Sequence, residues 1–271
     1  EGDKAASPPA GPKEETVATA KDTLKAAQVC VTLQRGGEGN AEDAMINEEP
    51  SSINANYGAL SQIHAGVSGG TQRRSLFRWD VSSIPPAANI LSAGVSFSMS
   101  STASATMRLH LVKVPWTEST VSWASFNNGF NANVLASFSN GYPASPTATV
   151  SLLSTVKDWI SGAAPNNGIL IEQQQLAGLT TFKSSEYPVA SARPRLNVCY
   201  QINCDPGFAD CDGNGKNGCE ASLNAPTSCG ACGVVCSFPN AAPACTAGAC
   251  TLGACNPGFA NCDGNPANGC E

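Results

Sequence analysis

The chain has 271 residues and a net charge of −6, and charged residues make up only 13% of it. This length accommodates one medium domain with a smaller region beside it. An acidic chain without a basic patch lacks the electrostatic footprint of nucleic-acid binding or of attraction to an anionic membrane surface. The sequence holds no run of about 18 apolar residues, which excludes an ordinary transmembrane helix.

The 13 cysteines are distributed unevenly along the chain. Two stand alone, Cys30 and Cys199, and the rest lie between Cys204 and Cys270. Such density is stable as disulfides only in an oxidising compartment, so we expect a secreted or cell-surface protein. The sequence has no signal peptide, and we expect Glu1 to be the first residue after cleavage.

The first part of the chain, residues 1–25, is rich in Pro, Ala, Lys and Glu, and a flexible N-terminal tether is expected there. Residues 26–202 then show short alternating segments separated by Gly, Pro, Asn and Ser, which indicates an antiparallel sandwich or barrel. The expected strands are Gln28–Leu33, Ser75–Val81, Ile90–Met99, Thr106–Val114, Thr120–Trp123, Gly168–Gln173, Thr180–Lys183 and Arg195–Tyr200.

One segment departs from this period of two. Leu152, Leu153, Val156, Trp159 and Ile160 fall on a single helical face. The Gly at 162 and the Pro at 165 supply the stop. The predicted fold is therefore mainly β: an antiparallel jelly-roll-like β-sandwich with one short helix, followed by a small disulfide-rich repeat region with little regular structure.

Cys30 and Cys199 lie in the first and last expected strands, each facing away from its apolar neighbours. If the two strands are adjacent, both sulfurs point to the same side of the sheet, and a disulfide would close the ends of the domain. The alternative is that either cysteine pairs with the C-terminal cluster.

An internal repeat is the strongest signal in the chain. The phrase from Cys204 to Glu220 recurs from Cys255 to Glu271, offset by 51 residues. One full repeat spans 203–254, and 255–271 is a truncated second copy, so we expect the natural polypeptide to continue. The full repeat holds eight cysteines, enough for four disulfides: Cys204, Cys211, Cys219, Cys229, Cys232, Cys236, Cys245 and Cys250.

Calcium is the one candidate cofactor. Asp210, Asp212 and Asn214 stand two apart before a glycine, as in the first half of a calcium loop, and Glu220 falls one residue before the position of the bidentate acid. The alternative, which we favour, is that Asp, Asn and Gly form tight turns between disulfides. Zinc is disfavoured because both histidines lie far from the cysteines.

Residues 40–200 resemble the DNRLRE domain, also classed as carbohydrate-binding module family 96. The matching stretches are Asp43-Ala-Met, Asn56-Tyr-Gly, Arg74-Ser-Leu-Phe-Arg-Trp-Asp80, Ile90-Leu-Ser-Ala, Trp116-Thr-Glu, Thr120-Val-Ser-Trp, Val156-x-Asp-Trp, Asn167-Gly, Ser184-Ser-Glu and Arg193-Pro-x-Leu. The resemblance implies a jelly-roll-like sandwich that binds polysaccharide. The cysteine repeats are similar to those of myxobacterial surface proteins, on the DCDGN…NGCE phrase alone.

A sugar site on a sandwich needs exposed aromatic faces beside amides and carboxylates. The candidates are Trp116, Glu118, Trp123, Phe126, Asn127, Asn128, Phe130 and Tyr142. The two tryptophans are more often core residues at such positions, whereas the phenylalanines and Tyr142 lie in a polar loop where exposure is expected. Arg74, Arg78, Asp158, Glu186 and Arg193 are expected in ion pairs that fix strand ends.

Catalysis has little support. Gly66-Val-Ser-Gly-Gly70 fits a nucleophile elbow by its letters, but it lies between two strands instead of a strand and a helix. We therefore predict a non-catalytic surface or matrix protein whose sandwich binds an extracellular polysaccharide or cell-surface glycan, with the cysteine repeats as a stalk. The alternative is a self-associating structural subunit of an extracellular filament, coat or adhesive assembly.

Overall fold

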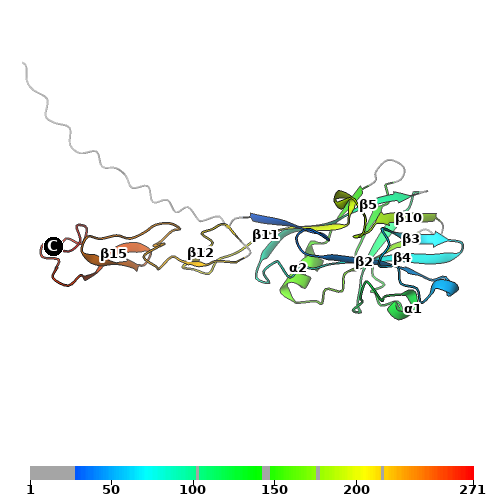
Figure 1. The fold of residues 1–271 in the computed structure, drawn as a ribbon, viewed down its shortest axis with the longest axis horizontal. Coiled ribbons are helices and arrows are strands. Elements are labelled where there is room, and N and C mark those ends of the chain that lie inside the picture. Colours follow the sequence, from blue (N-terminus) through cyan, green and yellow to red (C-terminus); the bar gives the residue numbers. More distant parts are fainter. Residues whose placement is uncertain (1–27, 102–103, 142–146, 175–177, 215–216) are drawn as a thin grey trace, which may run out of the picture.

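The structure is a computed structural model that describes residues 28–101, 104–141, 147–174, 178–214 and 217–271. The expected N-terminal tether lies outside these ranges. Figure 1 shows a broad β domain from which residues 203–271, here termed the cysteine-rich region, extend as a narrow rod.

Two antiparallel sheets form the β domain. The first sheet contains β1 (Gln28–Leu33), β11 (Arg195–Gln201), β5 (Asn89–Ser101) and β8 (Thr147–Ser151). The second sheet contains β10 (Gly178–Lys183), β3 (Gln62–Ser68), β4 (Thr71–Trp79), β9 (Ile169–Gln173), β6 (Thr106–Leu111) and β7 (Ala136–Ser139), with β2 (Ala41–Asn47) paired to β4. The C-terminal end of β5 also pairs with β10 of the second sheet, and this pairing joins the two sheets.

The two sheets enclose one apolar core, and β5 illustrates how the sequence builds it. Val95, Phe97 and Met99 are buried, while the residues between them are more exposed. The ring of Phe97 packs against Phe77 and Phe182 of the second sheet, with centroids 4.9 and 5.7 Å away. This arrangement confirms the predicted mainly β, antiparallel sandwich.

The expected helix is present as α2 (Leu153–Ser161). Its buried side chains include Val156, Trp159 and Ile160, which lie on one face. The helix ends at Gly162, whose φ of 77° is a left-handed conformation that glycine adopts without steric cost. Helix α2 packs against β5 and closes that end of the core.

Some predicted element boundaries are wrong. The residues expected as strand Thr120–Trp123 instead form a turn and the start of the one-turn helix α1 (Trp123–Phe126), because Ser122 and Ser125 make a reciprocal capping box. The strand expected to reach Val114 ends at Leu111. The sequence analysis did not predict β2, β3, β7 and β8. Two short 3₁₀ helices, Pro50–Ser52 and Ala190–Ala192, complete the domain.

The disulfide Cys30–Cys199 joins β1 to β11, where the two residues lie directly opposite each other. The cysteine-rich region contains β12 (Phe208–Ala209) paired to β13 (Ala221–Ser222), and β14 (Ala241–Thr246) paired to β15 (Ala249–Cys255). Its disulfides are Cys204–Cys219, Cys211–Cys232, Cys229–Cys245, Cys236–Cys250 and Cys255–Cys270. Within the described residues, no helix is long and apolar enough to cross a bilayer.

Candidate functional site

Residues 112–130, which contain most of the predicted sugar-binding side chains, form a loop over the outer face of the second sheet. Trp116 and Phe126 pack there against Ile46, Leu76 and Leu170 in a second, smaller core. Their exposed fractions are 7% and 3%. Trp116 is therefore a core residue, the alternative favoured for the tryptophans, whereas the exposure expected for Phe126 is wrong. The loop uses both rings to cover apolar strand residues that would otherwise meet water.

Trp123 and Phe130 are half-buried, and the protein's own arginine covers them. The Arg74 guanidinium lies 4.8 Å from the Trp123 ring centroid and 4.9 Å from that of Phe130. Arg74 also donates hydrogen bonds to Asn128 Oδ1 (2.8 Å) and Glu172 Oε2 (3.1 Å). A cation stacked on both rings takes the place that a sugar ring would need.

The two asparagines of this loop act locally. Asn127 and Asn128 are exposed and have positive φ values of 45° and 53°. The backbone N–H of Asn127 donates to the carbonyl of Trp123 at 3.2 Å and ends α1. Asparagine tolerates this left-handed conformation better than most residues, which gives both residues a turn-forming role. Tyr142, the last residue of the predicted set, lies outside the described residues.

A larger concave site lies elsewhere on the sandwich. A cleft of about 660 Å³ opens where β2 and β4 meet the segment after β4 and helix α2. Its floor is apolar, with Ile84, Trp159 and Ile160, each less than 10% exposed. Its rim carries Asn40, Glu42, Arg78, Asp80, Ser82 and Asn166.

The rim offers hydrogen-bonding groups of fixed orientation. Arg78 forms an ion pair with Glu42 and lies 5.1 Å from the Trp116 ring centroid. Asn166 donates to the carbonyl of Trp79 at 2.7 Å. Hydrogen bonds from the side chain and backbone of Ser82 lower the pKa of Asp80, so this exposed carboxylate is ionised at neutral pH. Such a cleft, apolar below and polar at its rim, is the usual form of a small-ligand site.

The sequence analysis missed this cleft because its residues come from four separate segments. Arg78 was expected in an ion pair, and it forms one with Glu42. Asn40, Asp80 and Asn166 stand next to strand ends, which is a weak signal that many turn residues share.

Glu118, another predicted sugar ligand, lies apart from the cleft residues in an ionic cluster. It pairs with Arg35 and accepts a hydrogen bond from the backbone N–H of Asp43 at 2.9 Å. Arg35 also pairs with Glu186. Burial, and then the charge of Glu186, raise the pKa of Asp43 well above its usual range. Glu118 therefore fixes the loop to the sandwich, and it does not line the cleft.

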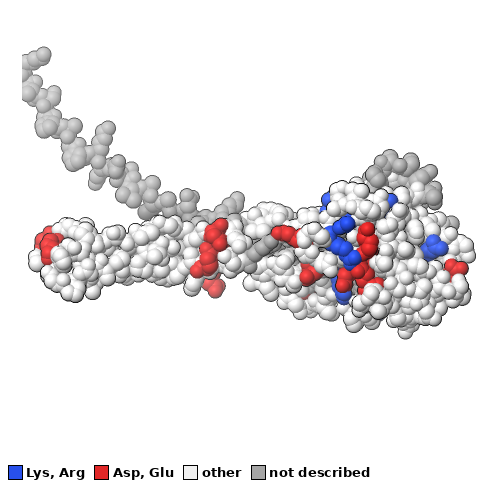
Figure 2. Space-filling view, in the orientation of Figure 1, with Lys and Arg blue, Asp and Glu red and all other residues white. Residues whose placement is uncertain are grey.

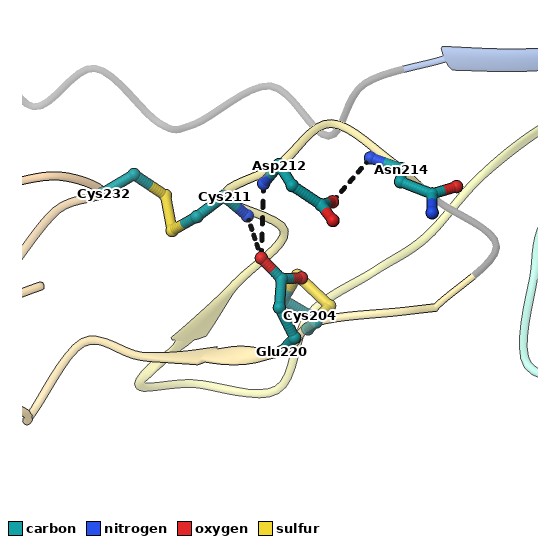
Figure 3. Close-up of a disulfide and its surroundings, with 7 residues drawn as sticks. Cys204, Cys211, Asp212, Asn214, Glu220 and Cys232 are labelled. Atoms are coloured by element: carbon teal, nitrogen blue, oxygen red, sulfur yellow. Dashed lines mark hydrogen bonds between the residues drawn. A yellow bond between two sulfur atoms is a disulfide. The ribbon is translucent and has the colours of Figure 1, made fainter.

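Two acidic residues of the first cysteine repeat, Asp212 and Glu220, direct their carboxylates at backbone N–H groups, as Figure 3 shows. Glu220 Oε1 accepts hydrogen bonds from the backbone N–H groups of Cys211 (2.8 Å) and Asp212 (3.2 Å). Asp212 accepts from Asn214 N–H at 2.8 Å and from the Asn217 side chain at 3.0 Å, and these bonds lower its pKa. Glu220 and Asp212 are thus engaged with the turn, whereas Asp210 Oδ1 is buried without a hydrogen-bond partner.

The second repeat forms most of the equivalent hydrogen bonds, although it lacks an acid at the first position. Glu271 accepts from Cys262 N–H at 3.0 Å, and Asp263 accepts from Asn265 and Asn268 at 2.8 and 2.9 Å. Position 261 is asparagine where the first copy has Asp210. A network that persists when one acid is lost fits the turn interpretation of this motif better than the calcium interpretation.

Comparison with known proteins gives one family. Residues 39–199 match carbohydrate-binding module family 96, and this span contains the whole sandwich cleft. The chain is therefore a carbohydrate-binding module protein with a disulfide-rich C-terminal region. It belongs to carbohydrate-binding module family 96. No curated protein matches the chain.

Proposed function

We propose that this chain is a non-catalytic extracellular protein that binds polysaccharide in the sandwich cleft. The observation that carries the proposal is the coincidence of two features: the family match over residues 39–199 and a cleft of about 660 Å³ that residues of this span build. The loop at 112–130, with its rings buried or covered by Arg74, is a poorer candidate.

The charge of the cleft favours a neutral glycan over a polyanionic one. Its charged rim residues are Glu42, Arg78 and Asp80, and the first two neutralise each other as an ion pair. Asp80 remains as an exposed carboxylate, which would repel uronate or sulfate groups. Asn40 and Ser82 beside it can donate and accept hydrogen bonds with sugar hydroxyls.

The cysteine-rich region would hold the sandwich away from its point of attachment. Figure 2 shows this narrow part of the molecule as largely uncharged, with bands of acid. Five disulfides hold its chain within short loops. Cross-links of this density belong to oxidising compartments, which supports an extracellular location.

The proposal is tested by titrating the full chain with soluble neutral and acidic polysaccharides in a calorimeter. We expect binding to a neutral polymer, and we expect the double substitution Asn40→Ala and Asp80→Ala to weaken it at least about tenfold, as the loss of one or two polar contacts would. Both side chains are exposed, so the fold should persist.

The matched control is Thr149→Ala, an exposed residue on the outer face of the first sheet. It should bind as the unsubstituted chain does. Equal affinity of the cleft variant and the control would show that the cleft is not the site. Absence of binding to every polymer tested would contradict the function itself.

The alternative function is a self-associating structural subunit. Cys262 is free among the described cysteines, but its counterpart Cys211 is bonded to Cys232, 21 positions further along, and the equivalent position for Cys262 lies past Glu271. The free thiol is therefore no argument for covalent assembly. Light scattering on the purified chain with and without reductant distinguishes the functions: a monomer in both favours the binding module, whereas large species that dissociate on reduction favour the structural subunit.

A further inference from the structure

Three carboxylates from distant parts of the chain converge at the edge of the sandwich. Asp43 lies in β2, Glu118 in the 112–130 loop, and Glu186 in the turn after β10. Each offers an oxygen that lies within 4.8 Å of those of the other two. Like charges repel at this range, so the fold must supply something that compensates for the repulsion.

Asp43 is the residue of this cluster whose carboxylate is only partly hydrogen-bonded by the protein. Its side chain is entirely buried, with an exposed fraction of 0%. One oxygen, Oδ2, accepts the backbone N–H of Ser185 at 2.6 Å. The other, Oδ1, is buried without a hydrogen-bond partner. Buried polar atoms are nearly always paired with protein, water or an ion, so Oδ1 points to a further ligand.

The charges around the cluster do not balance. Arg35 pairs with both Glu118 and Glu186 and contributes one positive charge against three negative ones. Arg193, on the same side, donates to the backbone carbonyls of Tyr187 and Arg35. Two negative charges therefore remain when all three carboxylates are ionised, and a divalent cation would neutralise them.

The donor set and its span fit calcium. Calcium prefers hard oxygen ligands at about 2.3–2.6 Å, so two ligands on opposite sides of the ion lie roughly 5 Å apart, close to the span of this cluster. Magnesium binds oxygen at about 2.0–2.1 Å in strict octahedral geometry and keeps several waters. The Ser185 hydroxyl, 3.1 Å from Glu186 Oε1, adds a further oxygen beside the cluster.

We propose that Asp43, Glu118 and Glu186 bind one calcium ion, which ties β2 to the 112–130 loop and to the turn after β10. This site is distinct from the acidic turns of the cysteine repeats, because all three of its residues belong to the sandwich and Asp43 is entirely buried. It is also separate from the cleft, because none of its three residues lines it.

The test is a calcium titration of the full chain after treatment with a chelator, followed by calorimetry and by thermal unfolding. We expect one calcium ion per sandwich and an unfolding midpoint that rises with calcium concentration. Asp43→Asn should lower calcium affinity at least tenfold and remove the rise in midpoint. Glu186→Gln, at a partly exposed position, should weaken binding in the same direction if Asp43→Asn folds poorly.

The matched control is Asp212→Asn in the first cysteine repeat, which should leave both measurements unchanged. The proposal is overturned if the chain binds no calcium, if Asp43→Asn binds it normally, or if Asp212→Asn abolishes binding. It is also overturned if calcium leaves the unfolding midpoint unchanged and a lower pH stabilises the unsubstituted chain more than it stabilises Asp43→Asn. That result would show that Oδ1 carries a proton instead of contacting a calcium ion.

Discussion

The sandwich and the cysteine-rich region are stabilised by different means. In the sandwich, two sheets bury a continuous apolar core, and one disulfide joins residues 169 positions apart. In the cysteine-rich region, the buried apolar side chains among the described residues are Ala209 and the half-cystines 229, 236 and 270. Its disulfides span only 14 to 21 positions.

This difference follows from what each stretch of sequence can bury. The sandwich has enough chain to cover two sheets, and its apolar residues alternate. The cysteine-rich region is a short segment rich in Gly, Asn and Pro that cannot build a comparable core, so cross-links replace it. The cleft proposed to bind polysaccharide is built on the sandwich, the region with the packed core.

Reduction of all disulfides should produce the largest difference in stability between the two regions. We expect the cysteine-rich region to unfold completely, because each native bridge of a small domain contributes about 2–5 kcal/mol and little else is buried there. The sandwich should stay folded with a lower midpoint, having lost only Cys30–Cys199. Hydrogen exchange before and after reduction measures both, and retained protection in 203–271 would contradict this account.

Phe97→Ala should destabilise the sandwich and leave the cysteine-rich region unaffected, the reverse of what is expected from reduction. This ring is 1% exposed and packs against Phe77 and Phe182. Its removal should lower the free energy of unfolding of the sandwich by about 3–5 kcal/mol, with amide protection in the cysteine-rich region unchanged. Chemical denaturation followed by tryptophan fluorescence reports the sandwich, since all four tryptophans lie there. A loss below about 1 kcal/mol would count against a tightly packed core.

Glu220→Ala should act only within its own turn. The substitution removes the acceptor of the Cys211 and Asp212 N–H groups, at a cost of about 1 kcal/mol. These two amides should exchange faster with solvent, while the Cys262 amide, bonded to Glu271, provides an internal control. Faster exchange throughout the sandwich would show coupling that this account does not predict.

The smallest expected effect concerns pH. The pKa of Asp80 is lowered in the folded chain by hydrogen bonds from Ser82, so its ionised form stabilises the fold above the unfolded pKa of about 4. That contribution is lost as pH falls through the folded pKa. Between pH 5 and pH 2 the unsubstituted chain should therefore lose slightly more stability than Asp80→Asn. Equal losses of stability in the two chains would mean that the hydrogen bonds from Ser82 do not favour the ionised form of Asp80.

Several of the strands that the sequence predicted have clear alternation. β1, β5 and β11 have one buried and one more exposed face. β2 was missed because almost all of its residues are buried, on both faces, so AEDAMIN shows no period of two. Helix α2 was predicted from its apolar face and its glycine stop.

The site was predicted less well than the fold. Phe126 stands among Ser and Asn residues, and nothing local indicates that its loop folds back over Leu76 and Leu170. The cleft depends on residues 40, 80 and 166, which only the tertiary fold brings together. The repeated turn was the exception, because its partners lie within ten residues of one another along the chain.

The most direct test of polysaccharide binding in the cleft is hydrogen exchange of the full chain, with and without a saturating amount of the neutral polysaccharide that binds best. We predict added protection in the segments that carry Asn40, Asp80 and Asn166, and none in residues 203–271. Protection centred on residues 123–130 or on the cysteine-rich region, with the cleft unchanged, would contradict the central claim.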